Sequence, residues 1–364
     1  MSYTSLTQSL NIAYPLIQAP MAGGITTPEL AAAVSNAGGL GSIASGYLPA
    51  DQLSEIIQKT KQLTDKPFAV NAFVPPDDEV DVSREEIKKA AKRLHPFYDE
   101  LGIKPPETPT RFDEPFEELI DVIIDEQVPA VSFTFGIPSK EIVSRLKQAG
   151  AYLIGTATTV NEAIHLEKAG MDAVVAQGSE AGGHRATFST SFEQALVGTI
   201  ALVPQVVDHV SIPVIAAGGI MDARGVLAAK VLGASAVQLG TAFLACEESG
   251  ANPIYQKTIL ESFEDSTVVT NVFSGKPARG IHNYFIESMN DNEDGILPYP
   301  YQNKLTQPLR KEAGKQENIQ FMSLWAGQGA RLAKKTTVEK LIQEIIRDYK
   351  TLTEKAAKKT KAES

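Results

Sequence analysis

The stretch PVIAAGGIMDARGVLAAKVLGASAVQLGT, residues 213–241, decides the fold of this chain. It begins with an apolar run at 213–217, continues with an amphipathic segment at 223–232 and ends with a second apolar run at 236–239. Continuous apolar runs are typical of parallel strands that are covered on both faces. The segment between the two runs is long enough for a crossover helix. The stretch therefore predicts one complete strand–helix–strand unit with parallel strands.

The same alternation extends through most of the chain. Apolar runs predict strands at 16–19, 40–44, 68–74, 130–135, 151–156, 173–176, 213–217 and 236–239. Amphipathic segments predict crossover helices at 27–37, 50–63, 139–149, 160–169 and 223–232. A glycine that can end a helix recurs shortly before several of these strands. The pattern favours an α/β fold, a (β/α)₈ TIM barrel with an inserted lid or cap domain, and a doubly wound open sheet is the alternative.

Two regions interrupt this alternation. The segment 75–114 is rich in proline and charge, with a helix expected at 84–94, and its role stays open. No strand–helix repeat is visible at 245–324, which we interpret as a lid over the barrel mouth. Helical periodicity returns at 338–352, so the barrel is expected to comprise 1–244 and 325–352. Residues 353–364 form a Lys- and Ala-rich end that we expect to be a flexible tail.

Composition excludes several classes of protein. The chain has 34 basic and 44 acidic side chains, a net charge of −10, which argues against nucleic acid or anionic membranes as general partners. Its one cysteine, Cys246, rules out an internal disulfide framework. No apolar stretch is long enough to predict a membrane span. Because no signal peptide is visible at the start, we expect a cytoplasmic protein.

Glycines follow directly after the last two predicted strands. Strand 213–217 leads into Gly218 and Gly219, and strand 236–239 leads into Gly240 and Thr241. Barrel enzymes commonly hold phosphate with the loops after these two strands, where backbone N–H groups approach an anion closely. The pair of loops therefore predicts a phosphate site, although tight turns alone would also explain the glycines.

A histidine stands in a third glycine-rich loop. The sixth predicted strand is followed by QGSEAGGH, residues 177–184, which ends in His184. At the carboxyl end of a barrel strand, His184 can act as a base, donate to a developing charge or orient a substrate. The other histidines lack this context and are expected to be structural: His95, His165, His209 and His282.

Further candidate contacts to a flat ligand lie at other strand ends. Met21 and the glycine pair after it follow the first strand, and a thioether suits contact with an aromatic ring system. Asn71 interrupts an apolar strand, where its amide is costly to bury unless it is paired. The run SFTFG at 132–136 places aromatic rings where they can line a pocket or fill the core. No cluster has the spacing of metal ligands.

Six motifs in this order resemble class I nitronate monooxygenases, formerly called 2-nitropropane dioxygenases. They are QAPMAGG at 18–24, NAF at 71–73, SFTFG at 132–136, QGSEAGGH at 177–184, AGGI at 217–220 and QLGT at 238–241. The resemblance spans nearly the whole chain. It implies an FMN-dependent barrel in which His184 is the active-site histidine. It also implies FMN contacts from Met21, Ala22, Gly23, Asn71, Gln177, Gly182, Gly219, Gln238, Leu239, Gly240 and Thr241.

The resemblance further implies a reaction. An alkyl nitronate and dioxygen would give a carbonyl compound and nitrite, with detoxification of propionate 3-nitronate as the presumed role. A flavin-dependent enoyl-acyl-carrier-protein reductase, which uses NAD(P)H and has a similar Glu-x-Gly-Gly-His loop, is the alternative. A non-catalytic flavin or phosphate module is a third reading.

Several features stay open at this point. Tyr299, Tyr301 and Lys304 are weaker candidates for lining an entrance or attracting a carboxylate. The preferred nitronate, the acceptance of neutral nitroalkanes and the oligomeric state are not legible in the sequence.

Overall fold

Eight parallel strands form the barrel. The computed structural model describes residues 4–363 except 77–81, 108, 110–114 and 291–294. The strand order is β1-β9-β8-β6-β5-β4-β3-β2, and a parallel bridge between Ile17 and Leu40 joins its two ends. The strands are β1 (Leu16–Gln18), β2 (Gly41–Ala44), β3 (Phe68–Phe73), β4 (Ala130–Thr134), β5 (Tyr152–Ala157), β6 (Ala173–Gln177), β8 (Val214–Ala217) and β9 (Ala236–Leu239). The predicted (β/α)₈ barrel is confirmed.

Helices cover the outside of the barrel. Side-chain hydroxyls of Thr27, Ser139 and Thr159 accept backbone N–H groups in the first turns of α2, α7 and α8, which explains where these helices begin. The covering helices are α2 (Pro28–Asn36), α3 (Ala50–Leu63), α6 (Phe116–Asp125), α7 (Lys140–Gln148), α8 (Val160–Lys168), α9 (Thr199–Val207) and α10 (Ala223–Val231).

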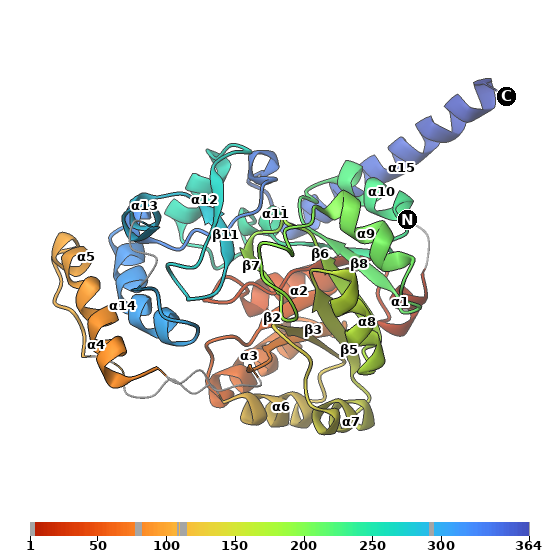
Figure 1. Cartoon of the computed structure of the whole chain (residues 1–364). Helices are drawn as coiled ribbons and strands as arrows, with labels where there is room; N and C mark the ends of the chain where they lie inside the picture. Colours follow the sequence, from red (N-terminus) through yellow and green to blue (C-terminus); the bar gives the residue numbers. More distant parts are fainter. Residues whose placement is uncertain (1–3, 77–81, 108, 110–114, 291–294, 364) are drawn as a thin grey trace.

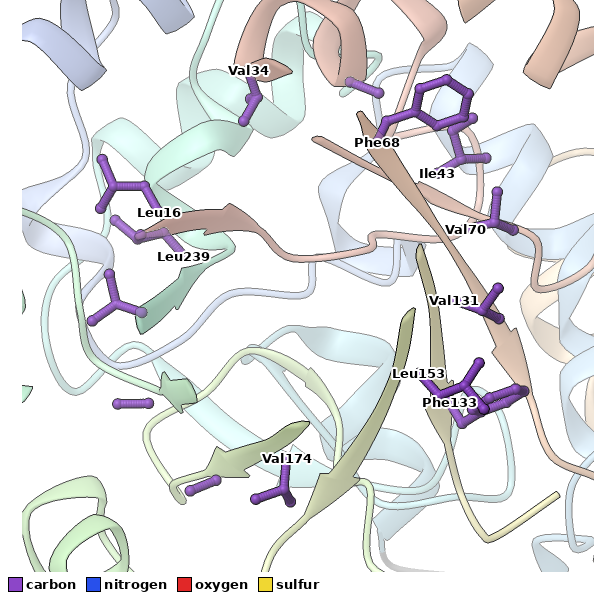
Figure 2. Packing of buried hydrophobic residues seen from close by; sticks show 14 of the residues in the cluster. Leu16, Val34, Ile43, Phe68, Val70, Val131, Phe133, Leu153, Val174 and Leu239 are labelled. Carbon is purple, nitrogen blue, oxygen red and sulfur yellow. The ribbon is translucent and has the colours of Figure 1, made fainter. Parts of the chain in front are cut away.

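Alternate residues of each strand face opposite sides of the barrel wall. Residues such as Val70 and Val131 pack outward against the helices, and Figure 2 shows them in this cluster together with Val34 of α2. Their neighbours Ala69 and Ala130 belong to a separate interior cluster. Because side chains alternate along a strand, every second position points into the barrel. This register decides which side chains reach the barrel mouth.

Helix α1 (Ser5–Ser9) closes the amino-terminal end of the barrel. Leu6 and Leu10 pack against the interior residues Ile17 and Ala69, and all four are buried. Side chains therefore fill the barrel interior at its amino-terminal end, and open space is left at the carboxyl ends of the strands.

A second hydrophobic cluster lies beside the barrel. It joins α12 (Pro253–Leu260), α13 (Tyr284–Asn290) and α14 (Tyr301–Lys315) to α4 (Arg84–Arg93) and α5 (His95–Glu100). Figure 1 shows α4 and α5 next to α14, away from the barrel. We call helices α12, α13 and α14, with β10 (Thr267–Thr270) and β11 (Ala278–Ile281), the lid. The described part of the 75–114 excursion thus packs on the lid, which the sequence did not reveal.

A short strand connects barrel and lid. Strand β7 (Gly183–His184), in the loop after β6, pairs antiparallel with β11, so that His184 lies opposite Ala278. Strand β10 pairs with the other side of β11 and completes a three-stranded sheet. The glycine-rich histidine loop is therefore held by backbone hydrogen bonds to the lid.

The last helix extends beyond the barrel. Helix α15 runs Val338–Glu363 and projects from the body in Figure 1. The segment expected to be a flexible tail from 353 onward is thus helical as far as Glu363. Among the described helices, none has both the length and the apolar character that crossing a membrane requires.

Candidate active site

A cavity of about 680 Å³ lies at the carboxyl ends of the barrel strands, under the lid. The residues predicted from sequence to form a site come together in its wall. They are Met21, Ala22, Gly23, Asn71, Gln177, Gly182, His184, Gly219, Gln238, Gly240 and Thr241. These residues come from five different parts of the chain, and the barrel topology brings them to one place.

Leu239 is the exception among the predicted contacts. Its side chain is 1% exposed and packs in the outward-facing cluster between strands and helices. Gln238, one residue earlier, faces the cavity instead. Because neighbouring side chains of a strand point to opposite faces, Gln238 and Leu239 cannot both face the ligand with their side chains. The structure therefore does not place the Leu239 side chain in the site.

Polar residues form the inward face of the strands at the cavity floor. Asn71 on β3 is 1% exposed, and its Nδ2 donates to Ser132 Oγ at 3.0 Å and to Thr134 Oγ1 at 3.2 Å. Both hydroxyls belong to β4 and also line the cavity. The buried amide thus has hydrogen-bond partners within the protein, as the cost of burying it requires.

Gln177 holds the histidine loop. Its Nε2 donates to the carbonyl oxygen of His184 at 3.0 Å, and its Oε1 accepts from the N–H of Ala186 at 3.0 Å. Both ends of the amide are therefore engaged with the backbone of the loop. Gln177 lines the cavity, but these contacts position His184 rather than a ligand.

The two glycine turns predicted for phosphate lie side by side across β8 and β9. Gly219 has φ +70°, a left-handed conformation that glycine adopts without steric cost. Helix α11 (Thr241–Leu244) begins directly after Gly240, and the first N–H groups of a helix have no partner within the helix. Two adjacent glycine turns at the carboxyl ends of neighbouring strands are an arrangement that suits the phosphate of a nucleotide-like cofactor.

A segment that we call the strap, residues 325–329, closes over these turns. The N–H of Gly327 donates to Thr241 Oγ1 at 3.0 Å, and the N–H of Gln328 donates to the carbonyl oxygen of Glu180 at 3.0 Å. A Cβ on Gly182 would lie 2.5 Å from the nitrogen of Gly327, so this close approach requires glycine. The sequence reasoning missed the strap, although its pattern WAGQG resembles the glycine-rich loops elsewhere.

His184 is held by the lid. Its Nε2 lies 2.8 Å from Ser274 Oγ, and Ser274 is 1% exposed and also hydrogen-bonded to the backbone of Lys276. Burial of the ring, together with the positive charges of Lys276 and Arg310, lowers the pKa of His184 to about 3. The imidazole is therefore neutral in the folded protein.

Aromatic rings surround the imidazole. The ring centroids of Phe135 and Trp325 lie 5.7 Å and 5.5 Å from that of His184, and Phe73 lies 4.8 Å from Phe135. Phe135 has φ +77°, an uncommon conformation for a bulky residue that costs about 1–3 kcal/mol. Strain of this kind is typical of functional sites. The aromatic residue in SFTFG that contacts the histidine is thus Phe135, whereas Phe133 is core.

The weaker candidates from the lid do not line the cavity. One face of α14 does so with Asn303, Gln307 and Arg310, in place of Tyr299, Tyr301 and Lys304. The Tyr299 ring packs 6.1 Å from Phe135. His282 is exposed outside the cavity wall. Sequence reasoning missed Ser274, Lys276 and Arg310, because they follow no strand of the barrel.

The fold and the cavity define a (β/α)₈-barrel enzyme with a lid, in which two glycine turns and a neutral histidine line one cavity. The family model for nitronate monooxygenase matches residues 4–348. The chain belongs to the nitronate monooxygenase family and is an oxidoreductase. The family implies a flavin cofactor.

Several known proteins are similar over nearly their whole length. A probable nitronate monooxygenase of Staphylococcus haemolyticus is 51% identical over 349 residues, 95% of this chain and 97% of the relative. One from Staphylococcus aureus strain Newman is 52% identical over 342 residues, 94% and 96% of the two chains.

Solved structures support the same fold. Nitroalkane oxidase from Streptomyces ansochromogenes has a TM-score of 0.87 at 40% identity, with 96% of this chain and 98% of that chain covered. FabK from Thermotoga maritima has a TM-score of 0.78 at 34% identity, with 98% and 99% covered.

Proposed function

We propose that the protein is an FMN-dependent nitronate monooxygenase that converts an alkyl nitronate and dioxygen into a carbonyl compound and nitrite. The observation that carries the proposal is the neutral His184, which lines the same cavity as the glycine turns and Arg310. Propionate 3-nitronate is the substrate that we propose, with detoxification as the role and the cytoplasm as the location.

The residues present fit FMN. The turns at Gly218–Gly219 and Gly240–Thr241 can hold its phosphate through backbone N–H groups. Met21, Ala22 and Gly23 line the cavity from the β1 loop, where they can contact a flat ring system. When bound, FMN would supply the one-electron redox chemistry of the reaction. The protein's part is to bind and orient the anion beside it.

The positive charges near His184 suit an anionic substrate. Lys276 and Arg310 are close enough to His184 for their charges to lower its pKa. A nitronate placed beside them would be stabilised by the same two charges. The hydrogen bond between Nε2 and Ser274 Oγ fixes the orientation of the imidazole, and its donor depends on the tautomer. In the tautomer in which the proton is on Nδ1, that N–H can donate a hydrogen bond to a nitronate oxygen.

The low pKa of His184 also bears on neutral nitroalkanes. A general base works best when its pKa lies near the working pH. With a pKa of about 3, His184 is a weak base, so we propose that preformed nitronates are better substrates than neutral nitroalkanes.

Nitrite release tests the proposed function. Purified, flavin-loaded protein is expected to release nitrite from propionate 3-nitronate in air without any nicotinamide. His184→Ala is expected to lower kcat/KM on the preformed nitronate by about 10- to 100-fold, because a hydrogen bond to a charged group is lost. Unchanged turnover in the variant contradicts this role for His184. Colourless protein after loading with FMN contradicts the flavin assignment.

The flavin-dependent enoyl-acyl-carrier-protein reductase is the second candidate. The enoyl reductase domain of MlnA has a TM-score of 0.64 at 11% identity, which shows a shared fold alone. The same protein sample separates the two functions. Rapid NAD(P)H consumption with an enoyl thioester, without nitrite release from nitronates, would favour the reductase.

A further inference from the structure

One face of α14 presents polar side chains to the cavity. Asn303, Gln307 and Arg310 follow each other at spacings of four and three residues, which places them on one side of the helix. They line the part of the cavity that the lid contributes. Two cations of this helix line the cavity, the exposed Lys311 and Arg310, whose Nε is buried. The surroundings of Arg310 indicate what it binds.

The guanidinium of Arg310 is only partly paired. Its Nη2 donates to the carbonyl oxygen of Asn303 at 2.9 Å and to Asn303 Oδ1 at 2.7 Å. Its Nε is buried and has no hydrogen-bond partner in the part of the chain that the structure describes. Asn303 thus fixes the orientation of the group and leaves donors of the guanidinium without acceptors.

No carboxylate among the described residues forms an ion pair with Arg310. Burial lowers its pKa, and the acidic groups close enough to oppose this are the phenols of Tyr47 and Tyr98. Buried charges are normally paired, because an unpaired charge in a protein interior is costly. A counter-ion from a ligand would remove this cost.

A second cation, Lys276, lies close to His184. Lys276 Nζ is 4.5 Å from the centroid of the Phe135 ring, and burial lowers the pKa of this lysine. Lys276 and Arg310 both act on the same imidazole. A ligand in the cavity would meet the charge of Arg310 directly and that of Lys276 from outside the lining residues, which favours a short ligand with two negative charges over a ligand with one.

We propose that Arg310 determines substrate specificity by binding a carboxylate carried by the nitronate, at the end of the substrate that is remote from the nitronate group. The guanidinium presents its donors in a planar fork that matches a carboxylate. His184 lines the same cavity and would contact the nitronate end, close enough to Lys276 for that charge to lower its pKa. This inference rests on the proposed function and assigns its carboxylate recognition to one residue of the lid.

Matched substrates test the assignment. Arg310→Met is expected to raise KM about 10- to 100-fold for propionate 3-nitronate and to leave kcat nearly unchanged. For the nitronate of 1-nitropropane, which lacks the carboxylate, KM is expected to stay the same. Arg310→Lys keeps the charge but loses the fork, and should give an intermediate KM.

A control and a binding measurement complete the test. Lys315→Met removes a cation from the same helix, where it pairs with Glu312 on the surface, and is expected to change neither KM. Succinate and butyrate are unreactive probes whose binding can be followed by the flavin spectrum of loaded protein. Wild type should bind succinate more tightly than butyrate, and Arg310→Met should remove the difference. Flavin content and melting temperature show whether each variant is folded.

The outcomes are distinct. Equal changes in KM for both nitronates, an unchanged preference for succinate, or a selective loss of NADPH binding in Arg310→Met would overturn the assignment. If wild type releases no nitrite from any nitronate, the proposed function fails, and the comparison of succinate with butyrate still decides whether Arg310 binds a carboxylate.

Discussion

At the scale of single residues, the protonation state and the orientation of His184 are determined by its neighbours rather than by the intrinsic pKa of histidine. An isolated histidine has a pKa near 6.5, and burial with two adjacent cations lowers it to about 3. Ser274, anchored to the backbone of Lys276, holds the ring in place. The residue is therefore suited to hydrogen bonding in a neutral state across the physiological pH range.

This shift predicts a pH dependence of stability. The folded-state pKa lies below the unfolded value, so protonation favours the unfolded chain, and stability falls as the pH decreases below about 6.5. Between pH 8 and pH 5 the loss due to His184 should be about 2 kcal/mol, because only the unfolded state takes up the proton in this range. Urea unfolding of wild type and His184→Gln at both pH values measures it.

In His184→Gln, all other groups that titrate between pH 8 and pH 5 are still present, so comparison with this variant isolates the contribution of His184. The difference in unfolding free energy between wild type and His184→Gln should become smaller, or reverse, at pH 5. A difference that stays constant from pH 8 to pH 5 would mean that His184 titrates normally in the folded protein.

At the scale of elements, the position of the strap depends on Gly182 in the histidine loop. A Cβ on Gly182 would lie 2.5 Å from Gly327 N and 2.6 Å from the carbonyl carbon of Ala326. Gly182→Ala must therefore displace the strap, at about 1–3 kcal/mol for overpacking. We expect a lower melting temperature and weaker retention of FMN, measured by gel filtration and flavin absorbance.

Gly314 provides the matched control for this substitution. A Cβ there meets no atom within 4 Å, and the residue lies in helix α14. Gly314→Ala should leave FMN retention unchanged and should not lower stability, because alanine favours helix. Tight FMN binding in Gly182→Ala would show that the strap does not close the cofactor site.

At the scale of the whole molecule, the excursion and the lid form one packed unit. Phe97 of α5 is 8% exposed, and its ring centroid lies 4.9 Å from that of Phe285 and 6.2 Å from that of Phe321. These three rings come from segments far apart in the sequence. Helix α14 packs in the same cluster, so this packing also positions Arg310 at the cavity.

Removing the ring of Phe97 should lower the stability of the lid more than that of the barrel. Phe97→Ala is expected to destabilise the protein by about 3–5 kcal/mol, the usual cost of truncating a buried phenylalanine. Hydrogen exchange should increase in α4, α5, α13 and α14 and stay low in the barrel strands. Uniform exchange over both parts, or no change, would contradict a lid that is packed as its own unit.

Much of the barrel could be predicted from the chain itself. Apolar runs, helix-ending glycines and the turns after β8 and β9 are local signals, because strand burial and left-handed backbone depend on neighbouring residues. The same alternation that places Gln238 in the cavity turns the side chain of Leu239 away from it, which the period of the strand also indicates. The turns, Asn71 and His184 followed from their positions at strand ends.

The sequence by itself determined the barrel, its strand ends and the residues that the barrel topology must bring to one rim. Only the tertiary structure decided that α4 and α5 pack on the lid and that Ser274 and Lys276 lie close to His184. It also decided that Arg310 faces the cavity with no carboxylate partner among the residues that the structure describes. The physical reason is that these contacts join segments of unrelated periodicity. Their energy comes from burial and charge in three dimensions, which no local pattern of residues encodes.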